Sequence, residues 1–143
     1  MKTLPGSFVG AFVLALMTGC ASGPEAVDNE PLEGTHWSLT QLGTQPATET
    51  NPEKAPYLEF LAAEKRVVGS GGCNRLGGSY TLDGDKITFG QMMGTMMACP
   101  HGMQQEQALH AAFKKVTNWR IEGDTLQFLD ASGQQIAAFK AKK

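Results

Sequence analysis

Soft metal ligands are concentrated between residues 92 and 103, where five methionines, one cysteine and one histidine occur within twelve positions. The methionines are Met92, Met93, Met96, Met97 and Met103. Thioethers suit Cu(I), and they stay available in an oxidising compartment where thiols do not. Two or three converging sulfurs would bind copper or consume oxidants. Methionine also fills irregular gaps between a sheet and a helix, and we favour this packing role.

The amino terminus predicts export and attachment to a lipid. Lys2 begins a positive region, residues 8–17 form an apolar run too short to span a bilayer, and small residues precede Cys20. This order resembles the bacterial lipobox, whose cysteine thiolate carries a diacylglycerol, although Met17 stands where Leu is preferred. We therefore expect a signal peptide at 1–19 and a lipid on Cys20. An ordinary signal peptide with a chance cysteine is the alternative.

The residues after the cysteine predict where the chain is held. Ala21 stands where Asp would favour retention at the inner membrane, so the resemblance implies the outer membrane, facing the periplasm. Residues 20–34 are nearly devoid of large apolar side chains and predict a flexible tether. We therefore expect the chain to contact the membrane through its amino-terminal lipid.

Two further cysteines predict a covalent link. With Cys20 lipidated, Cys73 and Cys99 remain as an even pair in an oxidising compartment. A disulfide between them would close a loop whose entropy contributes roughly 3.5 kcal/mol. Two buried, unbonded thiols are the alternative.

Other chemistry has little support in this sequence. The histidines, His36, His101 and His110, lack zinc-ligand spacing, and no hydrolase, phosphate-loop or zinc-protease motif occurs. Ser70 lies among glycines but has no strand-turn-helix context, so a turn or bulge is expected there. Without a Lys/Arg run, nucleic-acid binding is not expected either. We predict neither an enzyme nor a cofactor.

Short alternating segments indicate strands, and one segment indicates a helix. Apolar residues at 109, 112, 113 and 116 have helical spacing, with Glu106 near the start of this helix. The expected strands are residues 36–42, 57–60, 66–70, 76–82, 86–89, 119–121, 126–129 and 136–139. Together they predict an α+β fold, with a curved antiparallel sheet of short strands packed around one main helix.

Two motifs carry a resemblance to a known family. Gly72-Cys73-Asn74-Arg75 is followed by Thr95-Met96-Met97-Ala98-Cys99-Pro100, with Glu106 on the next helix. This order resembles the META domain, typified by the HslJ-like heat-shock lipoproteins, over about residues 35–140. The resemblance implies a META-like domain at 35–143, no established catalytic residues, and Asn74, Arg75, Thr95, Met97 and Glu106 as motif residues.

The resemblance also implies a role, because family members are associated with heat shock, motility and resistance. We expect a non-enzymatic binding or structural role in envelope stress tolerance, exerted by a monomeric domain, with an unidentified envelope protein as a possible partner. Asn74 is expected to bond the turn backbone, and Arg75 to pair with a carboxylate such as Glu106. An exposed Arg75 that grips an anionic partner is the alternative.

Overall fold

The computed structural model describes residue 19, residue 23 and residues 26–48 and 52–143. Its helices and strands, in chain order, are β1 (His36–Leu42), β2 (Gln45–Pro46), a 3-10 turn (Pro52–Lys54), β3 (Tyr57–Leu61), β4 (Arg66–Ser70), β5 (Arg75–Asp83), β6 (Lys86–Phe89), β7 (Met93–Gly94), α1 (Met103–Lys115), β8 (Asn118–Glu122), β9 (Thr125–Leu129) and β10 (Gln135–Ala141). Among these residues, no helix is long and apolar enough to cross a membrane.

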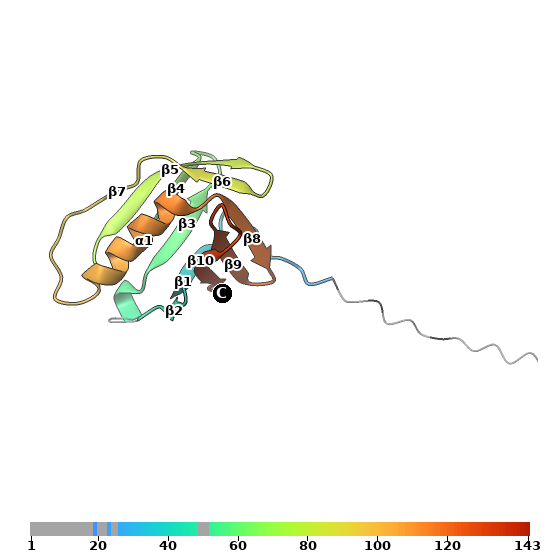
Figure 1. Cartoon of the computed structure of the whole chain (residues 1–143), viewed down its shortest axis with the longest axis horizontal. Coiled ribbons are helices and arrows are strands. Elements are labelled where there is room, and N and C mark those ends of the chain that lie inside the picture. Colours follow the sequence, from blue (N-terminus) through green and yellow to red (C-terminus); the bar gives the residue numbers. More distant parts are fainter. Residues whose placement is uncertain (1–18, 20–22, 24–25, 49–51) are drawn as a thin grey trace, which may run out of the picture.

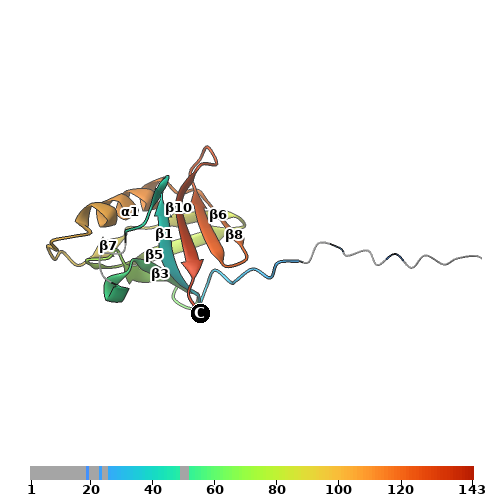
Figure 2. The ribbon, with the colours of Figure 1, turned by 90° about the horizontal axis from the view of Figure 1, so that it is seen from below.

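Eight of the described strands form a closed antiparallel barrel. The order β10-β9-β8-β6-β5-β4-β3-β1 returns to its start because β1 and β10 also pair, from Trp37 opposite Ala141 to Leu42 opposite Ala137. The two strands lie side by side in Figure 2. The short strands β2 and β7 are attached to β1 and β5. The predicted sheet wrapped around a main helix was therefore wrong, since the strands close on one another.

The helix is an accessory to this barrel and not its centre. It has 13 residues and lies between β7 and β8 in the sequence. The barrel strands on either side of this insertion, β6 and β8, pair only through Lys86 and Asn118. In Figure 1 the helix passes in front of β3 and β4, and its backbone comes nearest to β1 and β10. The predicted stripe, Leu109, Ala112, Phe113 and Val116, is buried. Strand side chains nevertheless supply most of the core, including Trp37, Phe60, Tyr80, Phe128 and Phe139.

Tight turns join several pairs of consecutive strands, as the sequence predicts. The hairpins β5–β6 and β8–β9 turn at Gly84 and Gly123, with φ of 60° and 62°. Glycine adopts this left-handed conformation without the steric penalty of a side chain. These turns make strands that are consecutive in the sequence neighbours in the sheet. Closure of the barrel instead requires pairing of β1 and β10, which come from the two ends of the domain.

The segment before β1 is packed on the barrel. The Trp37 indole donates to the carbonyl of buried Leu32 over 2.9 Å. The carboxylate of Glu33 accepts hydrogen bonds from the Tyr80 hydroxyl and from Lys65, which together lower its pKa. Leu32 and Glu33 are therefore packed against the barrel. Cys20 and residues 1–18 lie outside the described residues.

Candidate functional site

The two sequence motifs meet at one corner of the barrel. A disulfide joins Cys73, in the turn before β5, to Cys99, in the loop between β7 and α1, with Cα atoms 6.0 Å apart. The bond ties that loop to the barrel wall. Cys73 is buried, and Cys99 is partly exposed.

A buried carboxylate holds the same turn from the helix side. Glu106, 5% exposed, accepts hydrogen bonds at one oxygen from the backbone N–H groups of Cys73 and Asn74, over 3.0 and 2.7 Å. Its other oxygen accepts from the Asn74 side-chain amide over 2.7 Å. Both carboxylate oxygens are therefore used in fixing the turn to α1, as buried polar groups require.

Asn74 extends this link to the loop. Its side-chain oxygen accepts from the Thr95 hydroxyl and from the Met97 backbone N–H over 2.9 and 2.7 Å, while its amide also donates to the Met97 carbonyl. The Thr95 hydroxyl in turn accepts from the Arg75 backbone N–H. We call the set Asn74, Thr95, Met97 and Glu106 the Asn74 bridge, because one amide side chain joins helix, turn and loop.

Close packing at this bridge requires a glycine that the sequence reasoning missed. A Cβ on Gly71 would lie 2.4 Å from the Glu106 side chain and 2.6 Å from one carboxylate oxygen. Such distances are far below van der Waals contact, so a side chain would displace the carboxylate. The run of glycines before Cys73 indicates that another part of the chain packs closely against this segment, but the sequence does not identify Glu106 as that neighbour.

Arg75 differs from its expected structural role. Glu106 bonds Asn74 and not Arg75, because Asn74 points inward whereas Arg75, the next residue, points outward with an exposed side chain. Asn74 lies in the turn before β5, whereas Arg75 is the first residue of that strand, on its outward side. Arg75 instead lines a groove on the outer surface of the barrel.

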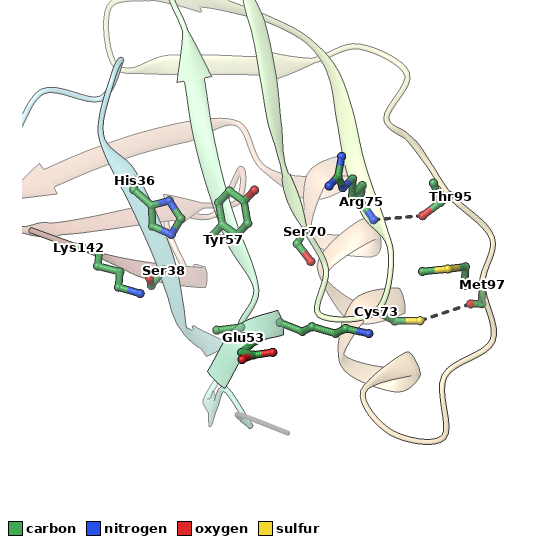
Figure 3. Close-up of a pocket in the computed structure, with 12 residues that line it drawn as sticks. His36, Ser38, Glu53, Tyr57, Ser70, Cys73, Arg75, Thr95, Met97 and Lys142 are labelled. Carbon is green, nitrogen blue, oxygen red and sulfur yellow. Dashed lines mark hydrogen bonds between the residues drawn. The ribbon is translucent and has the colours of Figure 1, made fainter. Parts of the chain in front are cut away.

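This groove, which we call the lateral groove, lies over β1, β3, β4 and β5 and has a volume of about 480 Å³. Figure 3 shows the side chains projecting from these strands, with the 3-10 turn at one end and the loop that carries Thr95 and Met97 at one side. Its lining residues are His36, Ser38, Glu53, Lys54, Ala55, Tyr57, Ser70, Cys73, Arg75, Thr95, Met97 and Lys142. The predicted motif residues Cys73, Arg75, Thr95 and Met97 thus share one surface.

Strand register aligns four of these side chains across the groove floor. Ser38 is opposite Tyr57, Tyr57 is opposite Ser70, and Ser70 is opposite Arg75. We call these residues the cross-strand row. Strand spacing of about 4.8 Å makes the row about 14 Å long. Alternation in the sequence could place each residue outward, but pairing between strands could not be read from the sequence.

The groove lining carries more positive than negative side chains. Lys54, Arg75 and Lys142 are exposed, against the carboxylate of Glu53, so the lining has three cations and one anion. Among the described residues, none of these three cations is in an ion pair. Because the whole chain has a formal charge of −2, the groove is a local positive region on a weakly negative protein.

Histidine side chains occupy separate positions. His36 stacks on Tyr57 with ring centroids 4.3 Å apart and bonds Glu59 over 2.8 Å. His110 lies on α1 against Phe113, and His101 is exposed in the loop before α1. In the described part of the chain, no three His, Cys, Asp or Glu side chains are grouped so that they could hold a metal ion.

The methionines depart from the favoured packing role. Met93, Met96 and Met97 are 69%, 97% and 54% exposed, whereas Met92 packs partly against the core and Met103 is partly exposed. Core packing was therefore wrong for three of the five. The reason is that β7 and the loop from β7 to α1 lie at the surface, where the disulfide and the Asn74 bridge hold the loop through other atoms.

Solved structures share this fold. The chain is similar to an NMR structure of a protein from Burkholderia xenovorans, with 26% identity and a TM-score of 0.62, covering 85% of this chain and 97% of that one. A second NMR structure gives 20% identity, a TM-score of 0.59 and coverage of 76% and 90%. A crystal structure of a DUF4847 family protein from Bacteroides vulgatus gives 13%, 0.61, 78% and 95%. The latter two show a common fold alone.

Comparison at the level of sequence families is more specific. A search of curated proteins finds no match. The META domain matches residues 30–143, which include both cysteine motifs, the helix and every described strand of the barrel. The match begins close to buried Leu32, in agreement with the packing of the segment before β1. The chain belongs to the META domain family.

Proposed function

We propose that this chain is a bacterial envelope lipoprotein, held at the outer membrane by a lipid on Cys20, whose META domain contributes to envelope stress tolerance by binding and not by catalysis. The convergence of both family motifs on the rim of the lateral groove is the observation that supports a binding role. The most buried polar groups there, Asn74 and Glu106, are engaged in fixing the loop, which supports a structural use of the motif.

Two features support the envelope location. The amino-terminal order of a positive start, a short apolar run and a cysteine resembles a lipoprotein signal. The disulfide between Cys73 and Cys99 is of the kind that persists in oxidising compartments such as the periplasm. Lipid chains would then keep the domain at the membrane surface, because each buried CH₂ contributes about 0.8 kcal/mol.

Lipid attachment can be tested directly. Cells producing the wild-type chain or the Cys20→Ala variant would be grown with an alkyne-bearing palmitate, and the purified chains would be examined for label and mass. We expect label on the wild type, a mass consistent with cleavage before Cys20, and no label on the variant. An unlabelled wild-type chain that fractionates with soluble periplasmic proteins would refute the anchor.

The stress role requires a separate measurement in cells. A deletion strain would be complemented with the wild type, with Cys20→Ala or with Arg75→Gln, and survival would be scored after heat and after membrane-perturbing agents. We expect the wild type to restore survival and both variants to restore less, at matched protein levels. If deletion leaves survival unchanged under all these stresses, the proposed role is wrong.

A second candidate function is supported by the exposed methionines. Met93, Met96 and Met97 present thioethers to solvent, as Cu(I) binding or oxidant buffering would require. Native mass spectrometry with Cu(I), and with limiting peroxide, would detect a copper adduct or sulfoxide on this loop. We expect any stoichiometric adduct to disappear when the three methionines are changed to Leu. Sulfoxide spread evenly over all methionines would count against the candidate.

A further inference from the structure

We infer that the lateral groove binds a short saccharide bearing an acidic group, an inference that rests on the proposed binding role and names its class of ligand. The groove combines unpaired cations, accessible hydroxyl groups and an aromatic side chain on one outer face of the barrel. Each feature corresponds to a different part of such a ligand.

The cations correspond to the acidic group. Lys54 lies at the end of the groove formed by the 3-10 turn, Lys142 beside β1, and Arg75 on β5. Since none of the three is in an ion pair among the described residues, a carboxylate entering the groove displaces no internal partner. Arg75 can bond a carboxylate through two parallel N–H groups, which makes it the strongest single anchor.

The cross-strand row corresponds to the hydroxyl groups of a sugar. Ser38 and Tyr57 each present a hydroxyl that can both donate and accept, and Ser70, which accepts from the Gly72 N–H over 3.1 Å, keeps its own proton to donate. Tyr57 also offers an apolar ring, braced by its stacking on His36, against which the C–H face of a sugar can pack. Alternating hydroxyls and C–H groups are the surface of a saccharide.

An acidic peptide fits this groove less well. Extended peptides are commonly bound by adding a strand to an exposed sheet edge. The floor here lies in the middle of the sheet, where β1, β3, β4 and β5 already pair with one another. Backbone groups are therefore occupied, and recognition must come from side chains. That arrangement favours a ligand rich in hydroxyls.

The size of the groove limits the ligand to a short oligomer. Its volume, about 480 Å³, falls within the usual range for small-molecule sites, about 300–1,000 Å³. The row of about 14 Å accommodates more than one sugar ring along its length. We therefore expect a disaccharide to occupy the floor, with its acidic group near Arg75.

The test uses a matched pair of disaccharides and the full chain. Isotope-labelled protein in micelles of lauryldimethylamine oxide would be titrated with digalacturonate, and with the neutral digalactose of the same linkage. Amide chemical shifts of Ser38, Ser70 and Arg75 report on the groove. We expect saturable shifts with digalacturonate and at least about tenfold weaker binding of the neutral sugar, corresponding to the loss of one charged contact. Affinity should fall as salt is raised.

Two variants separate the groove from net charge. Arg75→Gln removes a cation from the row, and Lys114→Gln removes one from the exposed face of α1, outside the groove lining. We expect Arg75→Gln to weaken digalacturonate binding at least about tenfold, and Lys114→Gln to change it less than about twofold. Equal losses would overturn the inference, because they would indicate nonspecific attraction.

Further probes test the chemical class. Tri-glutamate and inorganic phosphate would be titrated in the same way. If either binds as tightly as digalacturonate, or if neither sugar gives saturable shifts, the saccharide inference is wrong. Binding of tri-glutamate in the groove would leave the proposed binding role standing, whereas absence of lipid from Cys20 would refute the anchor whatever the groove binds.

Discussion

Glu106→Gln is the substitution that most directly tests the Asn74 bridge. It keeps the size of the side chain but replaces one acceptor oxygen by an NH₂ group that can only donate. In the native site three N–H groups converge on the carboxylate, two backbone N–H groups at one oxygen and the Asn74 amide at the other. A glutamine cannot satisfy all three.

The magnitude follows from the best orientation of the new amide. Its oxygen would face the two backbone donors, and its NH₂ would face the Asn74 amide, since turning Asn74 would break its bonds to Thr95 and Met97. An Asn74 N–H and the new NH₂ then face each other without an acceptor, which leaves two buried donor groups unpaired at about 1–3 kcal/mol each, and the two bonds to the remaining oxygen weaken by about 1 kcal/mol each. Relief from burying a charge offsets part of this. We expect a net loss of about 2–4 kcal/mol in the free energy of unfolding.

Urea unfolding under non-reducing conditions, followed by circular dichroism, measures this loss. Glu64→Gln is the matched control, because it makes the same chemical change at an exposed turn position and should alter stability by less than about 0.5 kcal/mol. A loss below about 1 kcal/mol for Glu106→Gln, with an unchanged slope against urea, would refute the assignment of Glu106 as the buried support of the turn.

Three other perturbations have defined outcomes. Gly71→Ala should destabilise the domain by more than about 2 kcal/mol in urea unfolding, and adding Glu106→Gln should cost less than the sum, because both disturb one contact. Reducing the disulfide between Cys73 and Cys99 should lower the free energy of unfolding by about 3.5 kcal/mol, compared with and without reductant. The pKa of Glu33 is lowered in the folded state, so its carboxylate stabilises the domain at pH values above the ordinary pKa near 4.5. This contribution is lost as the pH falls through the lowered pKa of the folded state. Glu33→Gln should therefore make the free energy of unfolding fall less steeply as the pH is lowered into the acid range.

Local patterns allowed several elements to be predicted from the sequence. The turns at Gly84 and Gly123 and the helical stripe from Leu109 to Val116 depend on residues close together in the chain, so period and turn chemistry were sufficient. The choice of Cys73 and Cys99 as partners likewise needed only a count of cysteines and a compartment.

Pairings between distant residues could not be predicted in this way. Barrel closure depends on β1 and β10, whose partners Leu39 and Phe139 are separated by almost the whole domain, and both strands would look the same at the edges of an open sheet. The predicted burial of the methionines was wrong for a related reason. Their apolar character favours the core, but the sequence does not show that Met97 is held through its backbone, which leaves its side chain exposed. The pairing of Arg75 with Glu106 depends on side-chain directions where the turn meets β5, and the sequence does not reveal that Asn74 points inward and Arg75 outward there.

Hydrogen bonding separates the residues that build the site from the residues left available to a ligand. Asn74 and Thr95 have their polar groups engaged in hydrogen bonds within the protein, and Glu106 bonds through both oxygens. Arg75 on β5 and Tyr57 on β3 instead point outward and line the lateral groove. Substitutions in the first group should therefore reduce stability and disturb binding only through the shape of the loop. Substitutions in the second should change binding at nearly constant stability, and measuring both quantities on Glu106→Gln and Arg75→Gln would reveal whether the two roles are separate.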